Sequence, residues 1–95
     1  MYVRITPIRF DLSREDSATQ VSKDVVLPLL QGLPGFQRYH GGLDPAQGTG
    51  VAISYWETRE QAQAVSEAVR TIGPQLQAAG IEPGSPVLYE IMVEG

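Results

Sequence analysis

Residues 51–58, VAISYWET, constrain the fold more than any other stretch of the sequence. β-Branched and aromatic residues dominate this stretch, which is typical of a strand. Thr58 and Gln61 follow at the spacing of a capping box, so a helix begins where the strand ends. Apolar residues then recur at helical spacing, at Val65, Ala68, Val69, Ile72, Leu76 and Ala79. The sequence therefore predicts a strand that passes almost directly into an amphipathic helix.

Three further segments have the composition or the alternation of strands: residues 2–10, 36–43 and 86–95. A first helix is expected over residues 14–31, because acidic residues occupy its first turn and apolar residues recur at helical spacing. Pro28 should bend or end this helix, since proline lacks the N–H group that the helix ladder requires. Gly73 and Pro74 should likewise kink or split the second helix, which Gly80 should end.

The resulting order is strand, helix, strand, strand, helix, strand. This order predicts an α+β, ferredoxin-like fold with a four-stranded antiparallel sheet and both helices on one face, because each crossover is right-handed. The other face would be bare and would expose apolar residues of the first strand (Ile8, Phe10) or of the last (Val87, Tyr89, Ile91, Val93). We therefore expect a homodimer in which two sheets pack face to face.

The composition excludes several classes of function. The formal net charge of -4 opposes nucleic-acid binding, which depends on clustered Lys and Arg. Without cysteine and with a single histidine, the chain cannot form a disulfide, a cysteine-zinc site or a multi-histidine metal site of its own. No segment resembles a signal peptide or a membrane span, and no G-x-G-x-x-G motif indicates a nucleotide cofactor. We expect one cytoplasmic domain, residues 1–95, without metal or cofactor.

Residues 34–64 resemble the central segment of the antibiotic biosynthesis monooxygenase-like family, whose members form dimeric α+β barrels. In that family a Pro-Gly-Phe turn enters the second strand, and a Trp-Glu-Ser/Thr sequence closes the third strand and opens the second helix. The matching residues here are Pro34, Gly35, Phe36, Trp56, Glu57 and Thr58. The order of elements also agrees over essentially the whole chain. The resemblance therefore implies a dimeric α+β barrel.

The resemblance also implies an activity. Some members of the family oxygenate phenols, quinols or anthrones without metal or flavin, and the residues attributed to this chemistry include a tryptophan that matches Trp56. An asparagine and a tyrosine of the same set correspond here to Ala52 and Ala62. Other relatives degrade haem with a histidine from the second helix, which has none in this chain. We therefore predict a cofactor-independent monooxygenase for a small aromatic quinol- or anthrone-type substrate. The alternative is a non-catalytic homodimeric module for small-molecule binding or association.

Six residues are candidates for the site. Trp56 either anchors the core or forms the wall of a cavity between the sheet and the helices, on the strand face that also carries Ala52 and Ser54. In the second case the small side chains of Ala52 and Ala62 would leave room for a ligand beside the indole. Trp56 is thus the first candidate catalytic residue, and Ala52, Ser54 and Ala62 are candidate substrate-binding residues.

Arg38 and His40 are the other two candidates. By strand alternation His40 shares a face with Phe36 and Arg38, and alternation alone does not assign that face to the core or to the dimer contact. His40 is a candidate catalytic base if a substrate proton lies within hydrogen-bond reach, and otherwise a structural histidine. Arg38 is a candidate substrate-binding residue for a phenolate or carboxylate, and otherwise forms a surface ion pair.

Overall fold

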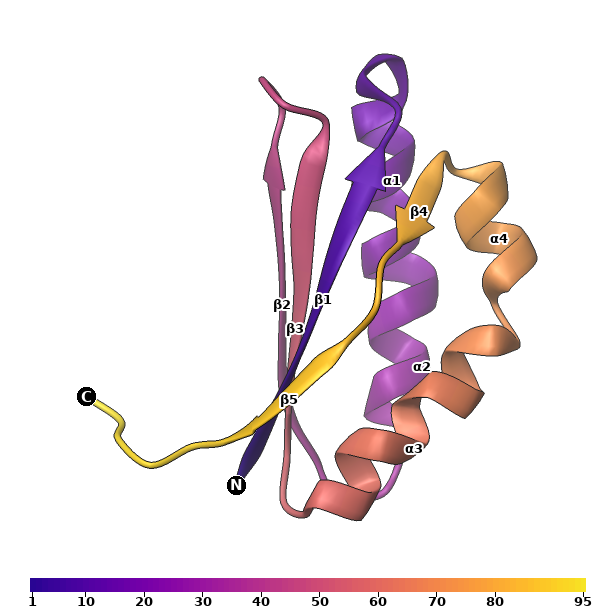
Figure 1. Cartoon of the computed structure of the whole chain (residues 1–95). Coiled ribbons are helices and arrows are strands. Elements are labelled where there is room, and N and C mark those ends of the chain that lie inside the picture. The colour runs from indigo at the N-terminus through magenta and orange to yellow at the C-terminus, as the bar shows by residue number, and fades with distance from the viewer.

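All helices of the protein lie on one face of its sheet (Figure 1). The computed structural model describes residues 1–95, and its elements follow in this order: β1 (Tyr2–Phe10), α1 (Glu15–Val21), α2 (Leu27–Gln31), β2 (Phe36–Asp44), β3 (Thr49–Trp56), α3 (Arg59–Arg70), α4 (Gly73–Ala78), β4 (Ile81–Pro83) and β5 (Val87–Glu90). The antiparallel sheet with a helical layer on one side confirms the predicted α+β, ferredoxin-like fold.

β1 lies inside the sheet and pairs along both of its edges. The strand order is β2-β3-β1-β4, and β5 pairs with the same edge of β1 as β4 does. β4 pairs with Ile8–Phe10 and β5 with Tyr2–Ile5, so the two short strands follow one another along this edge (Figure 1). Together they occupy the fourth strand position of the predicted sheet.

The predicted last strand, residues 86–95, is wrong in its bounds. A separate strand, β4, forms before it, and β5 ends at Glu90. Pro83 and Pro86 frame the break between the two strands, and neither can donate a hydrogen bond to a ladder. Inside the break the Gly84 N–H donates to the carbonyl of Pro7 over 2.7 Å, which keeps the chain against β1.

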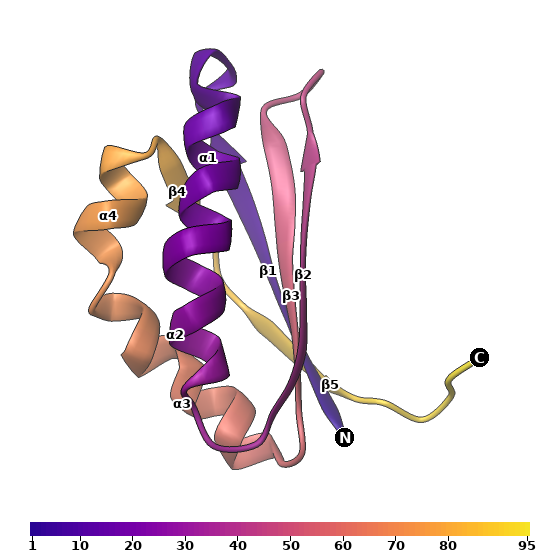
Figure 2. The same ribbon diagram turned by 180° about the vertical axis from the view of Figure 1, so that it is seen from behind.

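The first helix continues through Pro28 because it widens just before this residue. Residues Ser22–Val26 form a π-helical turn between α1 and α2, and the N–H of Leu27 donates to the carbonyl of Ser22, five residues earlier. This wider turn places Pro28 at the start of α2, the position at which a helix tolerates proline. α1 and α2 therefore run on as one helical rod across the sheet (Figure 2).

The start and the break of the second helix are confirmed as predicted. The Thr58 hydroxyl accepts from the Gln61 N–H over 3.2 Å, and the Gln61 side chain accepts from the Thr58 N–H over 3.0 Å. This capping box begins α3 directly after β3. The helix ends at Arg70, and a second short helix, α4, begins at Gly73. Gly80, with a φ of +78°, follows α4.

Two clusters of buried side chains form the core between the sheet and the helices. One cluster contains Phe10, Ala18, Ile72, Leu76, Ala79 and Ile81, and the other contains Leu30, Trp56, Ala62 and Val65. Phe10 is thus covered, and the bare face carries instead the exposed side chains of Val87 and Tyr89. No helix is both long enough and apolar enough to cross a membrane.

Candidate functional site

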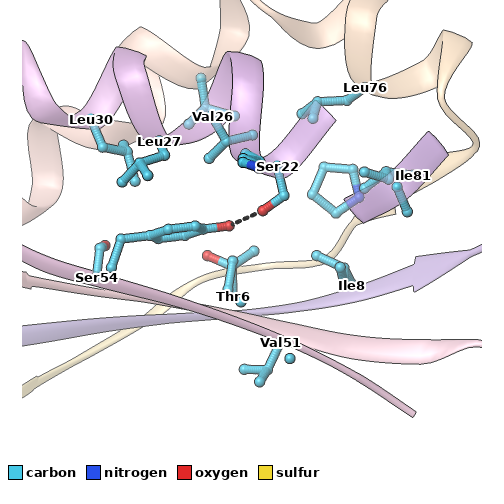
Figure 3. A pocket seen from close by; sticks show the side chains of 18 of the residues that line it. Thr6, Ile8, Ser22, Val26, Leu27, Leu30, Val51, Ser54, Leu76 and Ile81 are labelled. Carbon is cyan, nitrogen blue, oxygen red and sulfur yellow. Dashed lines mark hydrogen bonds between the residues drawn. The ribbon is translucent and has the colours of Figure 1, made fainter. Parts of the chain in front are cut away.

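A cavity of about 320 Å³ lies between the sheet and the helices. Members of both core clusters line it, and apolar side chains make up most of its wall, among them Ile8, Val26, Leu27, Leu30, Leu76 and Ile81 (Figure 3). The polar side chains of the wall are few: Arg4, Thr6, Thr19, Ser22, Lys23, Tyr39 and Ser54. An apolar cavity with a small number of polar groups is the usual form of a small-molecule site.

The hydroxyl groups of Ser22 and Tyr39 meet at the wall of this cavity. They are 2.8 Å apart and join the helix to β2 (Figure 3). Burial raises the pKa of the Tyr39 phenol, an effect that the bond to Ser22 partly offsets, so the phenol stays protonated at neutral pH. Ser22 belongs to the π-helical turn, and such turns are frequent at functional sites.

Trp56 does not line the cavity but contacts a residue that does. Its side chain is fully buried and packs edge-to-face on Phe36, with ring centroids 5.6 Å apart. The indole N–H donates to the hydroxyl oxygen of Ser54 over 2.8 Å. Ser54 lines the cavity, so this hydrogen bond connects the indole to the cavity wall. Of the two predicted placements of Trp56, the structure shows the core anchor.

Of the three small candidate residues, two line the cavity and one lies in the core. Ala52 and Ser54 line the cavity, as expected for residues that alternate on the inner face of β3. Ala62 does not line it: this residue is fully buried in the cluster of Trp56, Leu30 and Val65. The expectation that Ala62 leaves room for a ligand beside the indole is therefore wrong, because the core closes around it.

Arg38 and His40 lie outside the cavity, on the bare face of the sheet. An irregularity in the β2–β3 pairing between Phe36 and Arg38 shifts the alternation by one residue. Phe36 thus packs inward on Trp56, whereas Arg38 lies over the outward Tyr55 ring, 5.2 Å from its centroid. The predicted shared face for Phe36 and His40 is wrong, and the cavity geometry gives no contact between a ligand and Arg38 or His40.

Arg4, like Ser22 and Tyr39, lines the cavity and is not among the site residues predicted from the sequence. Its guanidinium donates to Thr6 over 3.1 Å and to Ser66 over 2.9 Å, and only 9% of the residue is exposed. Desolvation lowers the pKa of Arg4 without removing its charge at neutral pH. An arginine on the same strand face as Ile8 and Phe10 was the signal available in the sequence.

No known family model and no curated protein matches the sequence. Solved structures do match it. An antibiotic biosynthesis monooxygenase of known crystal structure is 17% identical, over 98% of this chain and 100% of that one, with a TM-score of 0.71. The monooxygenase ActVA-Orf6 of Streptomyces coelicolor, solved with nanaomycin D, is 18% identical over 99% and 88% of the two chains, with a TM-score of 0.63. This chain has the antibiotic biosynthesis monooxygenase fold.

The same fold occurs in a haem-degrading protein. MhuD of Mycobacterium tuberculosis, solved with two haems in its active site, is 14% identical over 100% and 99% of the chains, with a TM-score of 0.78. The antibiotic biosynthesis monooxygenase fold thus hosts more than one chemistry, and the likeness shows the fold alone. The resemblance found in residues 34–64 is confirmed at this level.

The residues of this chain do not fit a haem. Haem iron is held by a His, Cys, Met or Tyr ligand. Tyr39 is the only such side chain in the cavity wall, and its hydroxyl is bound to Ser22. His40 lies on the opposite face of the sheet, and no group of three or more His, Cys, Asp or Glu side chains is arranged to hold a metal ion.

Proposed function

We propose that the cavity binds a small aromatic quinol- or anthrone-type substrate and oxygenates it without a cofactor. The observation that carries this proposal is the cavity itself, a mostly apolar space of about 320 Å³ with hydroxyl and guanidinium donors in its wall. Its volume is at the lower end of small-molecule sites, which suits two or three fused rings. The monooxygenases that share the fold support the reaction class.

The chemistry requires little of the protein beyond binding and orientation. Anthrone loses a proton to water, the enolate passes an electron to O₂, and the two radicals combine at the ring carbon as a peroxide anion, which takes up a proton from water. Loss of water then leaves a carbonyl, so one oxygen atom enters the product and the other leaves as water. The cavity wall would exclude solvent, hold the ring and stabilise the anion through fixed donors.

Oxygen uptake with anthrone tests this proposal. We expect about one O₂ consumed for each anthrone oxidised, at a rate at least about tenfold above autoxidation in buffer, a modest factor for an enzyme. The protein boiled and cooled serves as the control for trace metals. A rate equal to autoxidation would exclude the proposed activity toward this substrate.

One observation favours the second candidate, a binding module without catalysis. The charged side chains of the cavity wall are Arg4 and Lys23, and no carboxylate or histidine lines it to take up a substrate proton. Such a module would gain thermal stability from anthrone, because ligand binding to the folded state stabilises it. If anthrone raises the melting temperature and oxygen uptake stays at the rate of autoxidation, the protein is a binding module.

Trp56 is proposed to act through Ser54, as a positioning residue. Because the Ser54 oxygen accepts from the indole, its own O–H is free to donate toward a ligand. We expect Trp56→Phe and Ser54→Ala each to lower kcat/KM for anthrone about tenfold, and the double variant to lower it no further, since residues in one hydrogen-bond network are not additive. Additive losses would contradict the coupling and leave Trp56 a purely structural residue.

We further propose that the protein is a homodimer joined through the bare face of the sheet. Val87 and Tyr89 are 45% and 57% exposed on this face, which no helix covers (Figure 2). Beyond β5 the chain leaves the body of the subunit, with Met92 and Val93 91% and 78% exposed (Figure 1). A second copy that covers the face and receives this apolar segment would remove both from water.

The cytoplasmic location stays a prediction.

A charge on this face tests the dimer. Light scattering at micromolar concentration should give twice the chain mass for the wild type and the chain mass for Val87→Glu, because an unpaired carboxylate opposes burial in an interface. Gln63→Glu adds the same charge on the exposed surface of α3 and should remain dimeric. A monomeric wild type would overturn the dimer.

A further inference from the structure

We propose that the cavity selects an organic anion, an aromatic ring system whose carboxylate or ionised enol pairs with Arg4. This inference names the substrate class of the proposed function and rests on the same cavity. Arg4 is buried, yet no carboxylate pairs with it. The only ion pair between side chains joins Arg70 and Glu67 on the exposed surface of α3.

A buried guanidinium without an anion is an unfavourable arrangement. Removing the charge from water is costly, and arginine does not escape that cost by losing its proton. The hydroxyls of Thr6 and Ser66 accept two of its five N–H donors, and both are neutral. No buried polar side-chain atom lacks a hydrogen-bond partner, so the Nε of Arg4, which bonds to neither hydroxyl, is in contact with open space.

The charges around the cavity are of one sign. Arg4 and Lys23 are the charged residues of its wall, although the whole chain carries a formal net charge of -4. Lys23 is exposed and Arg4 is buried, so Arg4 is the charge that the low-dielectric wall surrounds. A buried cationic group in an apolar cavity attracts an anion, because the low dielectric strengthens the interaction. The guanidinium plane matches a carboxylate or a delocalised enolate with two parallel N–H bonds.

A second hollow reaches Arg4 from outside. It lies beside α3, α4 and β4, and Arg4 and Thr6 line both it and the cavity. Glu82 lines the hollow as well, without an ion pair to Arg4. Arg4 thus stands where the two spaces meet, so an anionic group that enters through the hollow meets the guanidinium while the ring occupies the apolar cavity.

For the proposed reaction this geometry favours the reacting form of the substrate. Anthrone reacts with O₂ as its enolate, and a fixed positive charge beside the enolate oxygen lowers the free energy of that anion. Arg4 would therefore both select an acidic ligand and stabilise its charge. A neutral ligand of the same shape would leave the guanidinium without a partner.

Calorimetric titration with naphthoate and with naphthamide, its neutral counterpart, tests the inference. We expect the wild type to bind naphthoate at least about tenfold more tightly than naphthamide, as for a buried charge pair. Arg4→Met should remove this preference, and Arg59→Met, which deletes an exposed arginine of α3, should keep it. Equal affinities in the wild type, or a preference that survives in Arg4→Met, would overturn the inference.

The melting temperatures of unliganded wild type and Arg4→Met test the same inference in a second way. If Arg4 serves a ligand, Arg4→Met should melt at the wild-type temperature or above it, because an apolar side chain replaces a buried unpaired charge. A lower melting temperature would mark Arg4 as a structural residue and contradict the inference. The wild-type comparison of the two ligands needs no variant, so it stands if Arg4→Met does not fold. Naphthoate preference without anthrone oxidation would support the anion site and overturn only the oxygenation.

Discussion

Replacing Ala52 with leucine should lower the affinity for anthrone about a hundredfold, or about 2.7 kcal/mol, and leave the protein folded. Ala52 lines the cavity from β3 and pairs with Thr6 of β1 and Gly41 of β2, so it lies at the middle of the cavity floor. The three added carbon atoms would occupy the space of the ligand ring. Oxygen uptake should fall in parallel with the affinity.

The same substitution should raise the melting temperature, which separates loss of the ligand from loss of the fold. Filling a cavity commonly stabilises a protein by about 0.5–2 kcal/mol, equivalent to several degrees in a domain of this size. Ile53→Leu, one residue along β3 and outside the cavity wall, is the matched control and should bind anthrone as the wild type does. Unchanged affinity in Ala52→Leu would place the ligand elsewhere.

Replacing Trp56 with alanine should lower the free energy of unfolding by about 3–5 kcal/mol, as for other buried aromatic residues. The indole is fully buried, contacts the Phe36 ring and supplies the hydrogen bond to Ser54. Since domains of this kind are stable by about 5–15 kcal/mol in total, the variant would retain little margin. Urea denaturation of the wild type and the variant measures the difference.

Trp56→Phe is the intermediate in this series and should lose less stability than Trp56→Ala, because the phenyl ring fills part of the space. If Trp56→Ala lowers the free energy of unfolding by less than about 1 kcal/mol, the neighbouring side chains must fill the space of the indole. That result would contradict the role of Trp56 as the anchor of the second core cluster.

The parts of the fold that depend on local signals could be predicted from the sequence. The capping box of Thr58 and Gln61 predicts the start of α3, and Gly73 with Pro74 predicts the break before α4. β4 could not be predicted in this way. It spans Ile81–Pro83 and is too short to show alternation, and it is a strand only because β1 offers it a free edge.

The sequence does not show the irregularity in β2 that decides which face its side chains occupy. Alternation has a period of two, so the single irregularity after Phe36 sends Arg38 and His40 to the opposite side of the sheet. Ala52 and Ser54 share the inner face of β3, as alternation predicts, because the β1–β3 pairing is regular; their role as substrate-binding residues stays a prediction. Alternation places Arg4 on one face of its strand, but the sequence does not show which face the helices cover. Arg4 becomes a site residue only because the structure buries it without an acidic partner.

Methyl NMR spectra recorded during a titration with naphthoate test most directly whether the cavity is the ligand site. Binding there predicts saturable shifts for the methyl groups of Ala52, Leu30 and Val65, which line the cavity. The methyl groups of Ile53 and Val87, outside the cavity wall, should not move. Shifts confined to Ile53 and Val87, or no saturable shift in the cavity, would contradict the assignment of this cavity as the site.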